Sequence, residues 1–141
     1  MAAFNKFQQF VEDLAHGVHD LGSDTLKVML TNTAPVATNT VKANLTEISA
    51  GNGYTAGGAT PARTSSGQTS GVYRLILEDV VFTASGGSIG PYRYAVLYND
   101  TPTSPADPLI GWYDYGSSQT SAAAETFTVD FDPTNGPVSL A

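Results

Sequence analysis

Cysteine is absent from the 141-residue chain, and cationic residues are scarce. Without Cys there can be no disulfide framework, thiolate metal site or Cys nucleophile, so stability has to come from packing and β pairing. Six Lys and Arg residues are scattered singly against thirteen Asp and Glu residues, for a net charge of −7. Because phosphate binding needs clustered cations, we expect no nucleic-acid partner.

Long apolar runs are also missing. No stretch of about 18 apolar residues could span a bilayer, and the N-terminus lacks the basic-then-apolar layout of a secretory signal. We therefore expect a soluble protein with no membrane partner. Charged residues make up only 13% of the chain, well below the usual quarter, and Gly, Ser, Thr, Ala and Asn are abundant. This composition predicts a polar surface of low charge density.

The densest set of strand-forming residues lies in the stretch 88–116. An extended strand over 92–98 would place Tyr92, Tyr94, Val96 and Tyr98 on one face and Arg93, Ala95 and Leu97 on the other. A turn-rich segment, 99–108, then leads to a second aromatic and branched run at 109–115. We predict a long hairpin at the centre of the core.

Shorter alternating patterns predict further strands on either side of this hairpin. They fall at 26–31, 72–82, 126–131 and 138–140, with a possible short strand at 45–48. The polar segment 33–44 should form a surface connection. The Ser/Thr/Gly-rich segment 59–71 and the polar link 117–124 complete the connections, and 59–71 is predicted to be a mobile linker.

The N-terminal segment has helical periodicity. Its apolar residues recur at spacings of three and four and predict a helix over 3–16, with Gly17 just past its end: Phe4, Phe7, Phe10, Val11, Leu14 and Val18. This apolar stripe could cover the sheet of its own chain, or it could pack on a neighbouring subunit.

Together these patterns predict a mainly-β fold. Many short strands, regular turns and no βαβ alternation favour a single antiparallel β-sandwich or jelly-roll-like domain over residues 1–141. An N-terminal helix or arm (1–22) would precede the sandwich proper (23–141).

The only two histidines, His16 and His19, are three positions apart at the predicted helix end. With Asp13, Asp20 and Asp24 they could form a metal site, but the donor set is poor for zinc. We favour solvent-facing or helix-capping roles for both rings. No G-x-S-x-G elbow is present for a Ser/His/Asp triad.

Two other motifs invite a ligand hypothesis. The glycine-rich run 51–58 lacks the third glycine, the lysine and the strand-loop-helix context of a phosphate loop, which favours a structural turn. Asp130 and Asp132 could bind calcium or act as paired carboxylates. Because Pro133 follows Asp132, turn capping is favoured instead.

Six aromatic residues in the central hairpin could form a sugar-stacking platform, but their alternation favours core or subunit-interface positions: Tyr92, Tyr94, Tyr98, Trp112, Tyr113 and Tyr115. Two glycosylation acceptor motifs, at Asn44 and Asn99, are chance matches if the chain is not exported. The sequence thus predicts no catalytic, cofactor-binding or metal-binding residue, and we expect a protein that is not an enzyme.

Several segments spread over almost the whole chain resemble a family of small virion proteins of tailed bacteriophages. The resemblance rests on FNKF with the following Phe10-Val11, SDTLKVML, GNGYTAGG, VLYND, PLIGW and FTVDF. These motifs consist of fold-setting glycines and strand residues and include no catalytic or ligand pattern.

The resemblance implies a capsid decoration, or cement, protein. Such a protein would bind the outer surface of the phage head, stabilise contacts between major capsid protein subunits, need no cofactor, and form a dimer or trimer. The aromatic hairpin or the helix would supply the shared surface of that oligomer. Alternatives are a tail, head-fibre or head-completion component, or a carbohydrate-binding adsorption module.

Overall fold

The computed structural model describes residues 2–141 and is mainly β, with antiparallel, sandwich-like sheets, as the alternation predicted. The described elements are β1 (Phe4–Lys6), α1 (Gln8–Ala15), β2 (Leu26–Thr31), a 3₁₀ turn (Lys42–Asn44), β3 (Arg63–Thr69), β4 (Val72–Leu77), β5 (Val80–Thr83), β6 (Ile89–Asn99), β7 (Leu109–Ser121), β8 (Thr126–Val129) and β9 (Val138–Leu140).

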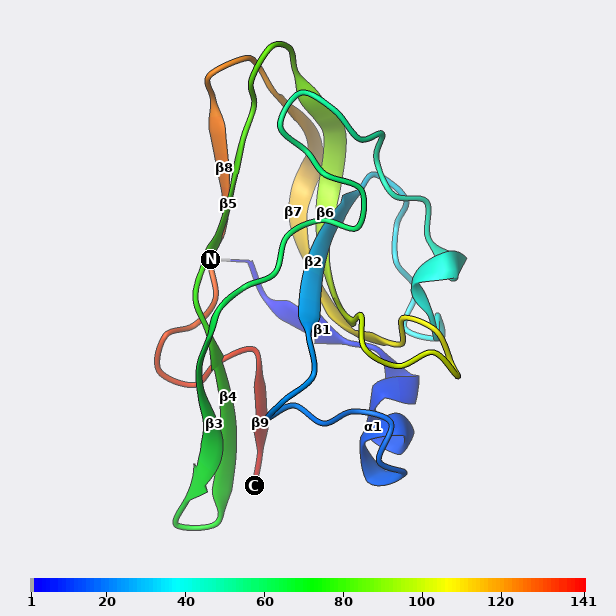
Figure 1. Ribbon diagram of the computed structural model, residues 1–141, viewed down its shortest axis with the longest axis vertical. Coiled ribbons are helices and arrows are strands. Elements are labelled where there is room, and N and C mark those ends of the chain that lie inside the picture. The colour runs from blue at the N-terminus through cyan, green and yellow to red at the C-terminus, as the bar shows by residue number, and fades with distance from the viewer. Residues whose placement is uncertain (1) are drawn as a thin grey trace.

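The first layer is a four-stranded antiparallel sheet in the order β1-β7-β6-β2 (Figure 1). The predicted hairpin forms its centre as β6 and β7, so that prediction is confirmed. The hairpin is longer than predicted, because β7 continues through 117–121 instead of becoming a polar link. Pairing of Tyr92 with Gln119 and of Ile89 with Ser121 satisfies the backbone of this polar stretch.

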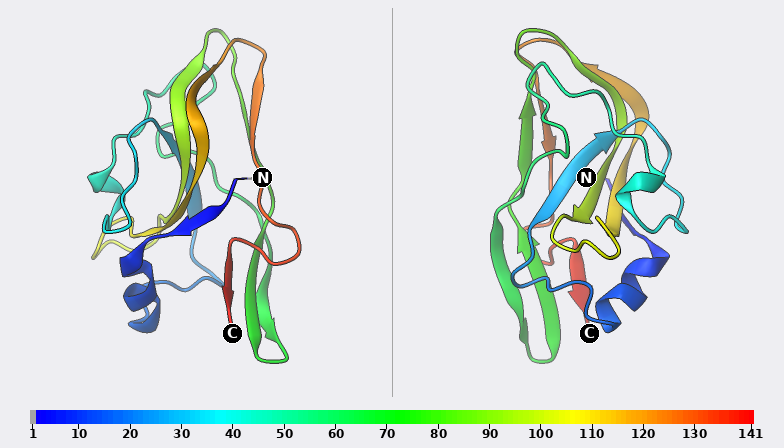
Figure 2. Two further views of the ribbon diagram at one scale, coloured as in Figure 1. Left: turned by 180° about the vertical axis from the view of Figure 1, so that it is seen from behind. Right: turned by 45° about the vertical axis from the view of Figure 1, so that its right-hand side comes forward.

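The second layer consists of two smaller antiparallel sheets, β3-β4-β9 and β5-β8 (Figure 2). The strand predicted over 72–82 is interrupted at Glu78 and Asp79, and its halves, β4 and β5, belong to different sheets. The Asp79 carboxylate accepts a hydrogen bond from the Phe131 amide (2.8 Å). This bond joins the interruption to the segment that follows β8.

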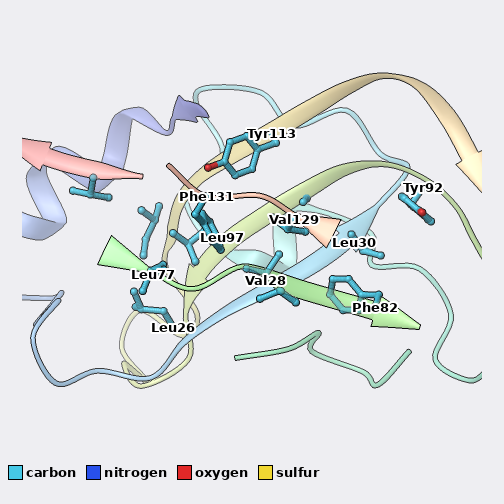
Figure 3. Packing of buried hydrophobic residues seen from close by; sticks show 14 of the residues in the cluster. Leu26, Val28, Leu30, Leu77, Phe82, Tyr92, Leu97, Tyr113, Val129 and Phe131 are labelled. Atoms are coloured by element: carbon cyan, nitrogen blue, oxygen red, sulfur yellow. The ribbon is translucent and has the colours of Figure 1, made fainter. Parts of the chain in front are cut away.

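The main core lies between the two layers (Figure 3). Side chains of the first layer, such as Val28 and Leu97, point toward Phe82 and Val129 of the second. All four are at most 5% exposed. Such burial is the main contribution to folding free energy in a chain without cross-links.

The expected faces of β6 need one correction. Pairing with β7 is irregular between Tyr92 and Tyr94, and this shift turns Tyr92 into the main core beside Ala95 and Leu97. Val96 and Tyr98 pack on the opposite side of the sheet, in a smaller cluster that also contains Phe7, Met29, Leu45 and Leu109. A β-bulge inverts the facing of the residues that precede it, which simple alternation cannot anticipate.

The predicted helix over 3–16 is wrong at its start. Residues Phe4–Lys6 form β1, which pairs with β7 opposite Gly111–Tyr113, and only Gln8–Ala15 is helical. Aromatic packing of Phe4 on Tyr113, with ring centroids 5.0 Å apart, favours the extended form there. Gly17 does follow the helix end with a positive φ, as predicted.

The segment 59–71 is not a mobile linker. Residues Arg63–Thr69 form β3, which pairs along β4 through a turn at Ser70 and Gly71, both with positive φ. Low-complexity Ser/Thr/Gly composition marks this strand as solvent-exposed on both faces, but it does not prevent backbone pairing. The possible strand at 45–48 is reduced to a single bridge between Glu47 and Thr31.

The glycine-rich run 51–58 is a structural turn, as favoured. At Gly58, where φ is +84°, a Cβ atom would overlap the Val28 carbonyl oxygen of β2. Only glycine permits both this conformation and this close backbone approach.

Candidate docking groove

An apolar groove separates the N-terminal segment from the C-terminal strand. It encloses about 320 Å³ and is lined by Phe4, Lys6, Phe10, Val11, Leu14, Ile110, Pro137, Val138, Ser139 and Leu140. β1 is an edge strand of the first layer, and β9 is an edge strand of the second. Both views in Figure 2 place β1 and α1 on one side of β9. The groove thus lies where two sheet edges face each other unpaired.

Large apolar side chains are exposed at this groove. Val11 of α1 is 51% exposed and Leu140 of β9 is 45% exposed, whereas Phe10 beside them is buried. The apolar stripe of the helix therefore does two things. Phe7 and Phe10 cover the sheet of their own chain, and Val11 stays exposed.

A second hollow, of about 560 Å³, shares Leu14 and Leu140 with the groove. Its further lining includes His19, Asp20, Leu21, Ser66 and Tyr73. The hydroxyl oxygens of Ser66 and Tyr73 are 2.8 Å apart, close enough for a hydrogen bond across the β3-β4 pair. The groove borders the free side of β9, whereas the second hollow extends over β9, β4 and β3.

His19 is buried, with 5% of its surface exposed, so the solvent-facing prediction for it is wrong. Its Nδ1 atom lies 3.0 Å from the Asn99 amide nitrogen, which also donates to Asp24 (2.7 Å). The Asn99 amide oxygen accepts from the Thr101 backbone N–H (3.1 Å), which fixes the orientation of the amide. Nδ1 must therefore accept, and the ring proton resides on Nε2.

The His19 Nε2 atom is buried without a hydrogen-bond partner within residues 2–141. The ring packs on Phe10, with centroids 5.1 Å apart. Burial lowers the pKa of His19, although the Asp13 and Asp24 carboxylates act in the opposite direction. The arrangement holds a neutral imidazole that joins the segment after α1 to the end of β6.

The other candidates for chemistry have structural or solvated positions. His16 is exposed after the helix end, as predicted. Across residues 2–141, no three His, Asp or Glu side chains are grouped to hold a metal ion. Asp132 accepts hydrogen bonds from the Thr134 and Asn135 amides (2.8 and 3.0 Å), which lowers its pKa and confirms turn capping.

Sequence reasoning missed a second polar cluster, centred on Glu47. Its carboxylate accepts hydrogen bonds from the Tyr54 hydroxyl (2.6 Å) and the Gly57 amide (2.7 Å), and Lys42 lies 3.3 Å away. The Tyr54 hydroxyl also accepts from the Leu30 amide (3.0 Å). Burial is the main cause that raises the Tyr54 pKa. This cluster fastens the glycine-rich turn onto β2.

The aromatic residues of the hairpin are mostly internal, as favoured. Tyr92, Tyr94, Tyr98 and Tyr113 are buried in the chain, and Trp112 and Tyr115 are partly buried. They provide no continuous exposed platform for stacking on sugar rings. Asn99, in one of the two glycosylation acceptor motifs, is fully buried, and its side chain makes the hydrogen bonds described above.

Comparison with protein-family models, curated proteins and solved structures found no match for this chain. None of the helices in residues 2–141 has the length and apolar character needed to cross a membrane.

Proposed function

We propose that this chain is a non-enzymatic structural protein of a tailed-phage virion, a decoration protein that binds the outer surface of the head on the major capsid protein. The sequence motifs quoted above first suggested this role. The structural observation that carries it is the kind of surface available: an apolar groove and open strand edges are exposed, whereas His19, Glu47 and Asp132 are engaged in the fold.

The β3-β4 hairpin is the second feature that suits docking on a protein lattice. It extends beyond the rest of the molecule at the bottom of Figure 1. All residues of β3 after Arg63 are exposed, and its outer edge is unpaired within the described chain. A polar edge of this kind can bond to a neighbouring strand, while its hydroxyl groups remain hydrated in the free protein.

Charge favours the outside of the shell. A net charge of −7 with few cations disfavours contact with packaged DNA. Many weak contacts to a repeating lattice add to strong attachment, so a binder without deep pockets is sufficient.

The test is to delete the coding sequence of this protein from the phage genome, and to image phage particles with and without the protein. We expect difference density at many symmetry-equivalent positions on the head, and earlier genome release on heating when the protein is missing. Adding the purified protein should restore both properties. Density confined to the tail or to a single vertex would contradict the decoration role. So would particles that lack the protein but have the same density and heat resistance as complete ones.

A further inference from the structure

We infer that the apolar groove is an interface between two copies of this chain, joined antiparallel through the open edges of β9. This inference goes beyond the proposed function, because it concerns the free protein in solution and does not depend on any capsid.

The first argument compares the open edges of the sheets. The β2 edge is partly covered by bridges from Ala59 and Glu47. The β3 edge is flanked by exposed polar residues, which discourage self-association through apolar contact. The two-stranded sheet β5-β8 also leaves an edge of each strand open. Among the edge strands of the two larger sheets, β1 and β9 are the ones that border the apolar lining of the groove.

The second argument is symmetry. A strand that pairs with its own copy about a two-fold axis perpendicular to the sheet is necessarily antiparallel, which is the pairing type throughout this molecule. Centring the axis on Ser139 places Val138 of one copy opposite Leu140 of the other. The sheet β3-β4-β9 then continues across the axis into its equivalent in the second copy.

The third argument is charge. Two copies that each carry −7 repel one another, and none of the thirteen carboxylate residues lines the groove. The one charged lining residue, Lys6, is cationic and exposed. Two copies that meet at the groove therefore bring no carboxylate of its lining into contact, which limits the repulsion between them.

The first experiment measures the mass of the full chain by sedimentation across a concentration series. We expect a reversible dimer, and we expect Leu140→Glu or Val11→Glu to raise its dissociation constant at least about tenfold by placing a carboxylate in an apolar interface. Val81→Glu is the matched control: Val81 on β5 is 55% exposed and lies outside the groove lining. It should leave the dissociation constant unchanged.

The second experiment uses the absence of native cysteine. In Ser139→Cys the two new thiols face each other across the axis, at a Cα separation that a disulfide can bridge. Mild oxidation should give a cross-linked dimer, and Val81→Cys should not. This readout also decides the matter if a glutamate variant fails to fold.

A chain that stays monomeric at all concentrations would overturn the inference. So would a trimer, or a dimer that is insensitive to Leu140→Glu and does not cross-link through position 139. None of these results bears on particle imaging, so the two proposals fail separately.

Discussion

The protonation of His19 is coupled to the fold. Burial lowers its pKa below the 6.5 of an unfolded chain, so the unfolded state binds the proton more readily. The free energy of unfolding should therefore be highest above pH 6.5 and should fall as the pH decreases below that value. Urea titrations at pH 7.5 and pH 5 measure this loss.

His19→Asn isolates this effect, because an amide oxygen can replace Nδ1 as the acceptor for Asn99 without titrating. We expect the variant to be less stable at pH 7.5 but to lose less stability between pH 7.5 and pH 5. The raised pKa of Asp107 acts in the opposite direction, but it is common to both proteins and cancels in the comparison. A variant of exposed His16 should behave like the parent.

Tyr54 offers a second prediction for a single side chain. Tyr54→Phe leaves the Glu47 carboxylate without one donor and the buried Leu30 amide without its acceptor. We expect a loss of about 1–3 kcal/mol in the free energy of unfolding. Tyr73→Phe removes an exposed hydroxyl bond to Ser66 and should change it by less than about 0.5 kcal/mol. Equal losses for the two variants would contradict a stabilising role for the buried hydrogen bonds of the Tyr54 hydroxyl.

For single residues, the sequence predicts which side chains are buried better than it predicts their hydrogen-bond partners. Alternation correctly placed Val129 and Phe131 in the core. It could not place His19, because the Asn99 amide that fixes the ring is 80 positions away in the chain. Partners at such separations depend on the tertiary fold and leave no local pattern.

Among the elements, β3 pairs with β4 and is also bonded through Arg63 to the segment before β2. Its guanidinium donates to the carbonyl oxygens of Leu21 (2.7 Å) and Asp24, in the segment before β2. Arg63→Ala should lower the free energy of unfolding by about 1.5–3 kcal/mol, because bonds to a charged group are lost. Thermal or urea unfolding measures this difference.

Two further variants sharpen the Arg63 test. Arg63→Lys should restore little of the stability, since one ammonium cannot reproduce the forked geometry. Arg74→Ala on β4, whose side chain makes no hydrogen bond or ion pair within residues 2–141, should change it by less than about 0.5 kcal/mol. A similar loss for Arg74→Ala would indicate a general effect of charge instead.

The helix and strand boundaries show how far local patterns reach. Spacings of three and four identified α1, yet the same residues are compatible with an extended start. Residues 4–6 form β1 instead of the first helical turn because they pair with the edge of β7, where Trp112 lies opposite Asn5. In the same way, the exposed segment 63–69 is a strand because β4 offers it a partner. Pairing partners outweighed local propensity in both cases.

For the molecule as a whole, charge should govern self-association. If two copies with −7 each meet at the groove, their repulsion is screened by salt over a Debye length of about 10 Å at 0.1 M. Raising the NaCl concentration from ~20 mM to ~200 mM should therefore strengthen the dimer several-fold. Sedimentation at constant protein concentration measures the shift. Weakening of the dimer by salt would indicate an interface held mainly by ion pairs.

The mainly-β, sandwich-like class follows from strand number and alternation. The division of the second layer into two sheets does not, because it depends on the interruption at Glu78 and Asp79, which a continuous apolar run conceals. The groove was equally hidden, since its two walls come from opposite ends of the described chain.

Pairing of β1 with β7 has a consequence for biosynthesis. Asn5 and Trp112 are 107 positions apart, so β1 has no partner until the strand around Trp112 has left the ribosome. Until then Phe4, Phe7 and Phe10 stay uncovered, and chaperones or other nascent chains have access to them. Slow codons placed after the stretch that encodes β1 would prolong this exposure, whereas rapid translation through β7 would shorten it.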